Sequence, residues 1–345
     1  MLTNKFTELR EKGFENKAIS IHEAKELLEL KDATQILSLS ATTRALSDKQ
    51  MGRKINFYYT SRYFPALSVT GSECALRCKH CQTKLLQNLT AAPSPTKLVE
   101  ICEKLAKKGA KGVLITGGCL PSGKVPLGNF LDAISSVKKK TNLIVIAHTG
   151  IVDFQEAEKL ASTGLDGAAV DVVGSPETTK AVYGIEIKPK TYTRTLKALE
   201  KAKIPIISPH VCVGLNFGNL KHELTSLEII SGIKPTTVVI TALMPLRGTP
   251  LEKVTVNPYD VAKVVSVSRL MFPNVPITLG CARSKGADRA LIEKLAIQAG
   301  VTSIATPSDF ALKQSESIGL TTESYAVCCA VPPASYLRLT STEEP

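Results

Sequence analysis

The chain has 345 residues, of which 43% are hydrophobic and only 5% aromatic, so it can bury a large core made mainly of aliphatic side chains. The N-terminal stretch Met1–Lys12 is charged and has no apolar run, so we expect no secretory signal, and no run of about 18 apolar residues predicts a membrane span. We therefore expect a cytoplasmic protein. The formal net charge of +12 favours an acidic partner, such as nucleic acid, a carrier protein or an electron donor, although charge also serves solubility alone.

The first 60 residues are typical of helices, which we expect over Thr3–Lys12, Ile21–Leu30 and Asp32–Leu46. Ser20 is followed three residues later by Glu23, a spacing that predicts a capping box at the start of the second helix. We expect these helices to form an extension ahead of the main domain.

After Arg62, short β-rich runs alternate with amphipathic helical stretches. The eight runs are Ala66–Thr70, Val113–Thr116, Leu143–Ala147, Gly167–Val172, Ile204–Val211, Thr237–Ala242, Ile277–Gly280 and Ser303–Ala305. The helical stretches lie near Lys97–Lys107, Leu127–Lys138, Phe154–Ser162, Thr193–Ala202, Leu220–Ile230, Pro258–Met271, Ala287–Ala299 and Phe310–Ser317.

This alternation predicts an α/β protein with a parallel sheet and helices around it. Eight β–α units predict a closed (βα)8 barrel of the TIM type, although an open six-strand barrel with a C-terminal cap fits the same pattern. We find no repeat, low-complexity tract or linker. We therefore expect a helical extension over residues 1–60, one catalytic barrel over residues 61–320, and a cysteine-containing tail over residues 321–345.

Nine cysteines are many for a cytoplasmic chain, and they indicate metal binding or catalysis rather than disulfides. Cys74, Cys78 and Cys81 follow the first β-rich run in a C-x3-C-x2-C spacing, at the barrel face where active sites lie. Three thiolates leave one iron of a 4Fe–4S cube free, and the amino and carboxylate groups of S-adenosylmethionine (SAM) can chelate that iron. The spacing predicts a SAM-cleaving cluster, although a zinc site that includes His80 has similar donors.

From about Ala66 to Ile304 the chain resembles the radical SAM superfamily, and its biotin synthase branch in particular. The segments that carry this resemblance are Thr116–Gly118, Gly167–Asp171, Gly174–Glu177, Val211–Leu215 and Met244–Pro250. The resemblance implies that His80 packs near the adenine of SAM. It also implies that the backbone of Gly117 and Gly118 meets the amino group of SAM, because glycine allows a close approach.

Further SAM contacts are implied by the same resemblance. Asp171 is the candidate for the ribose hydroxyls, with a structural pairing to a barrel Lys or Arg as the alternative. Gly214 and Leu215 are similar to the element that packs on adenine. Arg247 is a candidate for the SAM carboxylate or a substrate anion, unless it is a structural loop residue.

The chain departs from biotin synthases in its second metal site. Biotin synthases hold a 2Fe–2S cluster with three cysteines and an arginine inside the barrel. The matching positions here are near Ile115, Ala147, Ser208 and Thr278, and none keeps the ligand. We therefore do not expect biotin synthase activity.

Three other cysteines lie where strands seven and eight end, namely Cys281, Cys328 and Cys329. Because these ends are neighbours in a barrel, we interpret the three as ligands of an auxiliary 4Fe–4S cluster, with a zinc clip or buried packing cysteines as alternatives. Cys119 is a candidate for the fourth ligand. We expect packing roles for Cys102, in the middle of a helix, and for Cys212, in a strand.

The chain looks closest to a group of biotin synthase-like radical SAM proteins, some of which act in pairs as a two-protein lipoyl synthase. The segments that carry this likeness are Val69–Cys81, Ile115–Cys119, Pro209–Leu215, Leu279–Arg283 and the Cys328–Cys329 pair. The resemblance implies that the chain is one half of such a pair, that it inserts sulfur at C6 or C8 of a protein-bound octanoyl chain, and that the auxiliary cluster is the sulfur donor. It also implies three partners: an acidic octanoyl or lipoyl carrier domain, a second radical SAM protein, and a ferredoxin-type electron donor. The +12 charge suits acidic partners.

Two other functions fit parts of the sequence. Another radical SAM sulfur insertion or methylthiolation, for example on tRNA, agrees with the basic charge, but we find no RNA-binding module and no aromatic platform, so nucleic acid is not favoured. A non-enzymatic zinc scaffold leaves the glycine stretch and the cysteine tail unexplained.

Overall fold

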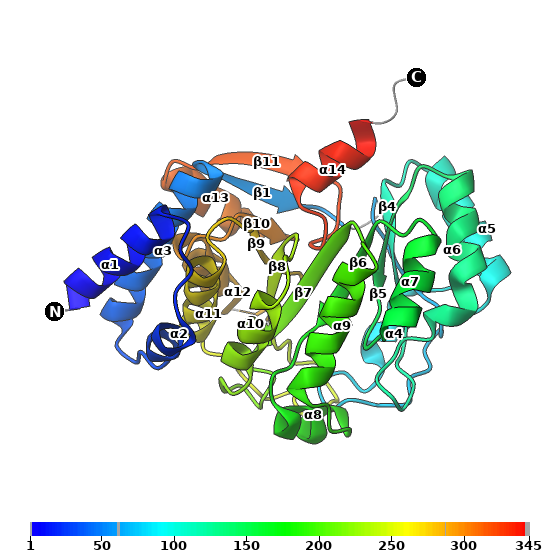
Figure 1. The fold of residues 1–345 in the computed structure, drawn as a ribbon, viewed down its shortest axis with the longest axis horizontal. Coiled ribbons are helices and arrows are strands. Elements are labelled where there is room, and N and C mark those ends of the chain that lie inside the picture. Colours follow the sequence, from blue (N-terminus) through cyan, green and yellow to red (C-terminus); the bar gives the residue numbers. More distant parts are fainter. Residues whose placement is uncertain (1, 61–62, 287, 342–345) are drawn as a thin grey trace.

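The computed structural model describes residues 2–60, 63–286 and 288–341; residues 1, 61–62, 287 and 342–345, at which some predicted segments begin or end, lie outside the described part. A curved parallel sheet forms the centre of the molecule, with helices around it (Figure 1). All eight predicted strands are present: β2 (Ala66–Ser68), β4 (Gly112–Thr116), β5 (Ile144–His148), β6 (Gly167–Asp171), β7 (Ile206–Val213), β8 (Val238–Ala242), β9 (Ile277–Leu279) and β10 (Ser303–Ala305).

Three strands were not predicted, namely β1 (Lys54–Tyr58), β3 (Thr90–Ala91) and β11 (Thr321–Tyr325). The strand order is β11-β1-β10-β9-β8-β7-β6-β5-β4-β2-β3, and neighbouring strands pair in parallel. The predicted parallel α/β arrangement is confirmed, but the sheet is a half-barrel rather than a closed ring. It does not close because β1 takes the edge of β10 that closure would need, and β11 extends the sheet further.

The N-terminal helices are α1 (Leu2–Phe14), α2 (Ile21–Leu28) and α3 (Ala33–Met51). The predicted capping box is present: the Glu23 N–H donates to Ser20 Oγ at 3.2 Å, and the Ser20 N–H donates to the Glu23 carboxylate at 2.8 Å. These helices pack against α11 (Pro258–Met271), which is consequently buried over nearly its whole length. The extension therefore completes the wall of the half-barrel at α11.

The other predicted helices are also confirmed. They are α5 (Pro95–Lys107), α6 (Leu131–Lys140), α7 (Phe154–Ser162), α9 (Pro189–Lys201), α10 (Glu223–Ser231), α12 (Asp288–Gln298) and α13 (Asp309–Ser317), with the 3-10 turn η1 (Leu127–Phe130) ahead of α6. Three short helices were not predicted: α4 (Lys84–Gln87), α8 (Pro176–Tyr183) and α14 (Pro333–Thr340). None of the helices in the described part of the chain is long and apolar enough to cross a membrane.

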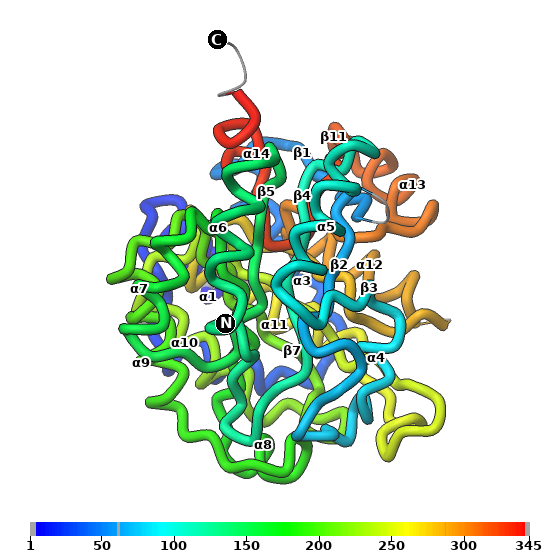
Figure 2. The backbone as a smooth tube through the Cα atoms, turned by 90° about the vertical axis from the view of Figure 1, so that its right-hand side faces the viewer, coloured from blue at the N-terminus to red at the C-terminus, as the bar shows by residue number. Residues whose placement is uncertain are grey.

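The segment between β11 and α14 turns into the half-barrel instead of lying on its surface (Figures 1 and 2). Residues 327–331 are all buried and share a hydrophobic cluster with side chains from β5, β6, β7 and β8. Ile144 and Ile206, in this cluster, are the first residues of their strands. The segment therefore fills the interior toward the N-terminal ends of these strands and carries Cys328 and Cys329 inside with it.

Candidate active site

The loop after β2 brings the three cysteines of the C-x3-C-x2-C run together. The Cys78 and Cys81 thiols are hydrogen-bonded to each other. The Cys81 N–H donates to the Cys78 carbonyl at 3.1 Å, while Cys74 Sγ accepts from the Cys119 N–H at 3.3 Å. Cys78 is buried, and the other two thiols are partly exposed, so a bound group would be accessible from one side.

The surroundings of Cys81 favour its thiolate, the form that binds iron. The hydrogen bond from Cys78 lowers the pKa of Cys81 well below its ordinary value, against the effect of burial. The imidazole of His80 and the backbone N–H of Thr83 act in the same direction. The hydrogen bond between the two thiols raises the pKa of Cys78, so the fit to an iron–sulfur cluster rests on the gathering of three thiols in one loop.

Gly118 lies directly against the cysteine loop. Its N–H donates to Thr70 Oγ1 at 2.7 Å, and the adjacent Cys119 carbonyl accepts from the Ala75 N–H at 2.9 Å. A Cβ atom at residue 118 would lie 1.9 Å from the Glu73 carbonyl oxygen. The glycine stretch thus holds the cysteine loop, and the contact of Gly117 and Gly118 with SAM stays a prediction.

We expect Gly118→Ala to lose the cluster that this loop holds, because the added methyl group must displace the backbone at Glu73 and Cys74. After anaerobic reconstitution, iron and sulfide per chain should fall by the amount that one cluster contains. Gly128→Ala is the matched control, since a Cβ there would meet nothing within 4 Å. An unchanged iron content in Gly118→Ala would contradict the expected packing.

Asp171 ends β6 and lies near the predicted adenine contact. Its side chain is 52% exposed, 3.9 Å from His148 Nδ1, and no described Lys or Arg forms an ion pair with it, so the structural alternative for Asp171 has no support. The pKa of Tyr183 is raised by burial and by the charge of Asp171, and the Tyr183 ring contacts His80 at 5.7 Å. His80 therefore contacts a partly buried tyrosine whose pKa also responds to the charge of Asp171.

Asp171→Ala is expected to weaken SAM binding by roughly 1–3 kcal/mol, or roughly 5- to 150-fold in Kd, because the ribose would lose a charged hydrogen-bond acceptor. Equilibrium dialysis of the anaerobic protein measures this. Asp132→Ala, which removes an exposed carboxylate from the outer helix α6, should leave Kd unchanged. Equal affinities for Asp171→Ala and the parent would exclude Asp171 from the SAM site.

The remaining predicted SAM residues lie at the end of β7 and in the loop after β8. Gly214 has φ +73°, its N–H donates to Glu223 Oε1 at 2.9 Å, and an added Cβ would lie 2.7 Å from a Val256 methyl group. Leu215 is 1% exposed. Arg247 is exposed in the loop after β8 and has no hydrogen-bond or ion-pair partner within the described residues. Gly214 and Leu215 are packed at the end of β7 and Arg247 is free to meet an anion, and the contacts of these three residues with SAM stay predictions.

A second group of thiols lies inside the half-barrel, where Cys281, Cys328 and Cys329 come together although 46 residues separate the first two. The Cys329 thiol is hydrogen-bonded to both Cys281 and Cys328. Cys328 Sγ also accepts from the Ala330 N–H at 3.4 Å. The predicted approach of these three thiols is therefore observed.

Arg283 anchors the loop that carries Cys281. Its guanidinium is 2% exposed and donates to the Gly280 carbonyl at 2.6 Å, to the Ala305 carbonyl at 2.9 Å and to Glu293 at 2.5 Å. Cys281 itself is solvent-exposed, yet burial among surrounding protein atoms contributes to raising the pKa of its thiol, after its hydrogen bond to Cys329. Because Cys281 is surrounded by protein atoms and is still reached by solvent, we infer that it lines a hollow.

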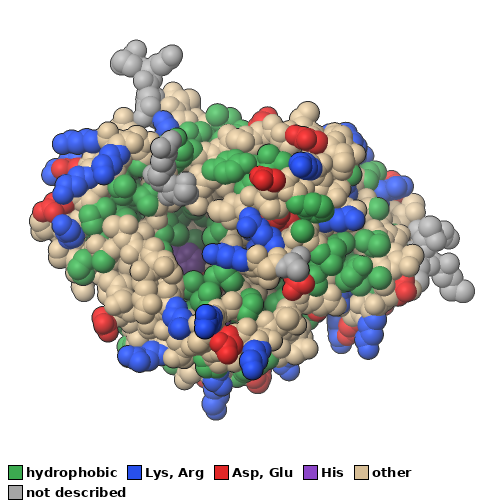
Figure 3. Space-filling model, turned by 180° about the vertical axis from the view of Figure 1, so that it is seen from behind, with side chains coloured by type: hydrophobic (Ala, Val, Ile, Leu, Met, Phe, Trp, Pro, Cys, Tyr) green, Lys and Arg blue, Asp and Glu red, His purple; other side chains and the backbone are tan. Residues whose placement is uncertain are grey.

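Two histidines that the sequence analysis did not select also face this hollow. His210 on β7 has Nε2 3.8 Å from Cys329 Sγ, and its ring lies 5.4 Å from that of His148 at the end of β5. Burial lowers the pKa of His210 to about 4, with His148 acting in the same direction, so the ring is neutral at pH 7. His210 was hard to select from the sequence, because the only indication of its role is that alternate side chains of a strand point into the barrel. Figure 3 shows a hollow with a histidine inside and Lys and Arg side chains around it.

The other cysteines separate into different places. Cys119 lies beside Cys74, away from the predicted fourth-ligand position. Cys102 is buried in α5, and Cys212 is hydrogen-bonded to Thr241. Within the described residues no three His, Cys, Asp or Glu side chains surround a point where one metal ion would sit. A 4Fe–4S cube differs from a single ion because each ligand binds a different iron, so its thiolates need not meet at one point.

Comparisons with known proteins agree with this arrangement. A model of the radical SAM superfamily matches residues 68–226, and a model of the biotin and thiamin synthesis associated domain matches residues 239–324. A biotin synthase of Clostridioides difficile (strain 630) is 28% identical over 296 residues, covering 81% of this chain and 86% of the relative. A biotin synthase of Neorickettsia sennetsu (strain ATCC VR-367 / Miyayama) is 26% identical over 248 residues, covering 69% and 74%.

Two solved structures share the fold. A methylornithine synthase superposes with a TM-score of 0.65 at 17% identity, covering 91% of this chain and 97% of that one. The FeFe-hydrogenase maturase of Carboxydothermus hydrogenoformans superposes with a TM-score of 0.66 at 16% identity, covering 98% and 82%. At these identities the likeness shows the fold alone. The two family models, which together match residues 68–226 and 239–324, and the biotin synthase relatives lead to one conclusion: the chain belongs to the radical SAM superfamily of enzymes and, within it, to a biotin synthase-like branch.

Proposed function

We propose that this enzyme inserts sulfur into an unactivated carbon chain, as one half of a two-protein lipoyl synthase acting at C6 or C8 of a protein-bound octanoyl group. The observation that carries the proposal is the gathering of Cys281, Cys328 and Cys329 inside the half-barrel. A radical SAM enzyme that only abstracts hydrogen needs one cluster, and these thiols would hold a second.

Membership of the family implies a 4Fe–4S cluster and SAM as cofactors. Cys74, Cys78 and Cys81 would hold the cluster, which with SAM supplies a 5′-deoxyadenosyl radical able to remove hydrogen from unactivated carbon. The chain itself contributes the ordering of the cysteine loop by Gly118, and Asp171 would orient the ribose of SAM.

The second group of thiols would hold an auxiliary 4Fe–4S cluster that supplies the sulfur. The loop of Cys281 is fixed by the buried Arg283, whereas Cys328 and Cys329 come from the inserted tail. Ligands from two separately anchored segments keep the group inside the hollow, where the substrate carbon would have to enter.

The relatives named biotin synthase suggest that activity as a second candidate, and the site argues against it. The positions that resemble those of the biotin synthase 2Fe–2S ligands fall near Ile115, Ala147, Ser208 and Thr278, and none of these four residues is a cysteine or an arginine. Ser208 donates its hydroxyl to the Ala330 carbonyl at 2.7 Å. The inserted tail therefore lies against one of these positions, and brings its own cysteines to the interior.

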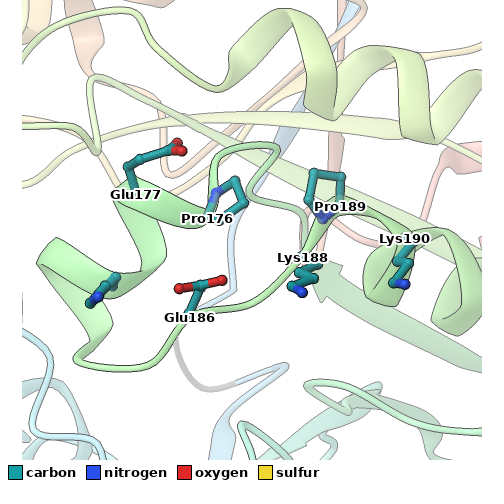
Figure 4. Close-up of a pocket in the computed structure, with 7 residues that line it drawn as sticks. Pro176, Glu177, Glu186, Lys188, Pro189 and Lys190 are labelled. Carbon is teal, nitrogen blue, oxygen red and sulfur yellow. The ribbon is translucent and has the colours of Figure 1, made fainter.

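Basic side chains near the SAM site support docking of acidic partners. Lys180, Lys188 and Lys190 line an open pocket of α8 and α9 together with Glu177 and Glu186 (Figure 4). Tyr183, which contacts His80, belongs to the same helix α8. An acidic octanoyl or lipoyl carrier domain, an acidic ferredoxin and a second radical SAM protein are the partners we propose, with charge complementarity raising the association rate.

The testing experiment combines metal analysis with product formation. We expect about eight irons per chain in the anaerobically reconstituted parent and about four in the Cys74/Cys78/Cys81 triple Ala variant. An octanoyl-lysine peptide should yield a thiolated product, whereas tRNA and the sulfur-free precursor of biotin should not. About four irons in the parent and none in the variant would leave a single cluster and exclude sulfur donation by a second one. Zinc without sulfide would support the scaffold function.

A further inference from the structure

His210, on β7, has an imidazole that approaches the second group of thiols from the strand side of the half-barrel. Its Nε2 lies 3.8 Å from Cys329 Sγ, and the residue is 7% exposed. Cys281 and the Cys328–Cys329 pair reach the same place from β9 and from the tail. Three chain segments therefore deliver three thiols and one imidazole to one part of the hollow.

A hydrogen bond to the backbone of Ser208 fixes the orientation of the His210 ring. Nδ1 lies 2.9 Å from the Ser208 carbonyl oxygen, which accepts hydrogen bonds only, so Nδ1 carries the proton. The lone pair then resides on Nε2, the atom that faces Cys329. A backbone carbonyl that accepts from one ring nitrogen while the other nitrogen faces outward is the usual support of a metal-binding histidine.

His148 lies in the same hollow but lacks these features. It is 5.4 Å from His210 ring to ring, is only partly buried, and its Nδ1 is 3.9 Å from the Asp171 carboxylate. Within the described residues His148 makes no hydrogen bond to a thiol, and its side chain meets Asp171 instead. The two histidines therefore form a matched pair for comparison.

We propose that His210 is the fourth protein ligand of the second iron–sulfur cluster, completing a set of three thiolates and one neutral imidazole. This inference rests on the proposed auxiliary cluster. An imidazole in place of a thiolate makes the cluster less negative, which raises its reduction potential, as histidine does in Rieske centres. It would also give one iron a ligand without negative charge, and therefore one that leaves more readily than a thiolate when the cluster is consumed.

The test uses the full chain with Cys74, Cys78 and Cys81 replaced by Ala, so that only the second cluster remains. Protein labelled with ¹⁵N-histidine or with ¹⁴N is reconstituted anaerobically, reduced, and examined by pulsed electron paramagnetic resonance. We expect a directly bound histidine nitrogen whose coupling changes with the isotope. His210→Ala should remove the coupling, His210→Cys should keep about four irons without it, and His148→Ala should keep both.

Two results would overturn the proposal in different ways. About four irons with no histidine coupling, or coupling that persists in His210→Ala, would leave the second cluster in place and remove His210 from its ligands. Absence of iron and sulfide in the triple Ala background, or zinc instead, would remove the second cluster itself and the proposed function with it. The labelled parent is informative even where His210→Ala fails to fold, because its measurement leaves His210 unchanged.

Discussion

Replacing Cys78 with Ala is expected to reduce 5′-deoxyadenosine formation to the background of the assay. Cys78 is the buried member of its loop, and its thiol is hydrogen-bonded to Cys81, so its loss removes one ligand and a contact that orders another. The measurement is the rate of 5′-deoxyadenosine release from SAM under anaerobic, reducing conditions, together with iron per chain.

Cys102→Ala is the matched control for this change. Cys102 is fully buried in α5 and takes no part in either group of thiols. Its replacement should cost about 1 kcal/mol of unfolding free energy and leave SAM cleavage intact. If Cys78→Ala still released 5′-deoxyadenosine at the rate of Cys102→Ala, the C-x3-C-x2-C loop would not be the cluster site.

The second large effect is expected from replacing Cys328 and Cys329 together with Ala. SAM cleavage should continue, because the hydrogen bonds of the first loop within the described residues do not involve the tail, whereas sulfur transfer to the octanoyl peptide should stop. Val327 and Val331, which pack in the interior cluster on either side, remain and should keep the tail inserted. The measurements are thiolated product and 5′-deoxyadenosine from the same reaction.

The same reaction separates a structural from a chemical role of the pair. A thermal unfolding curve close to that of the parent shows that the tail is still folded. Thiolated product at the parent level in the double variant would exclude Cys328 and Cys329 as ligands of a sulfur-donating cluster. Loss of both products would point to a general collapse of the site instead.

Much of this fold follows from local patterns in the sequence. The eight β–α units alternate clearly enough that all eight strands and their helices are found where they were expected. β1 was missed because it is a five-residue strand soon after a long helix, and β11 because four of its five residues are exposed. β1 pairs with the free edge of β10, and β11 pairs with β1. That edge exists only in the assembled sheet, so neither segment shows it in its own sequence.

The sequence predicted those parts of the site whose residues stand at a characteristic spacing in the chain. Cys74, Cys78 and Cys81 share one loop, and their order in the chain indicates their chemistry. Cys281 and the Cys328–Cys329 pair could be associated because both follow strands. His210 has no such signal, since its relation to Cys329 arises only when the tail enters the interior beside β7.

The inserted tail sets an order for the biogenesis of the enzyme. Residues 327–331 follow β1 to β10 in the chain, so a ribosome delivers them after the strands that they contact. During that interval the nascent half-barrel holds Cys281 without its two neighbours and leaves apolar strand residues, such as Ile144 and Ile206, uncovered. The interior of a newly made chain is therefore completed only after the last segment of the chain has been synthesised and has folded in.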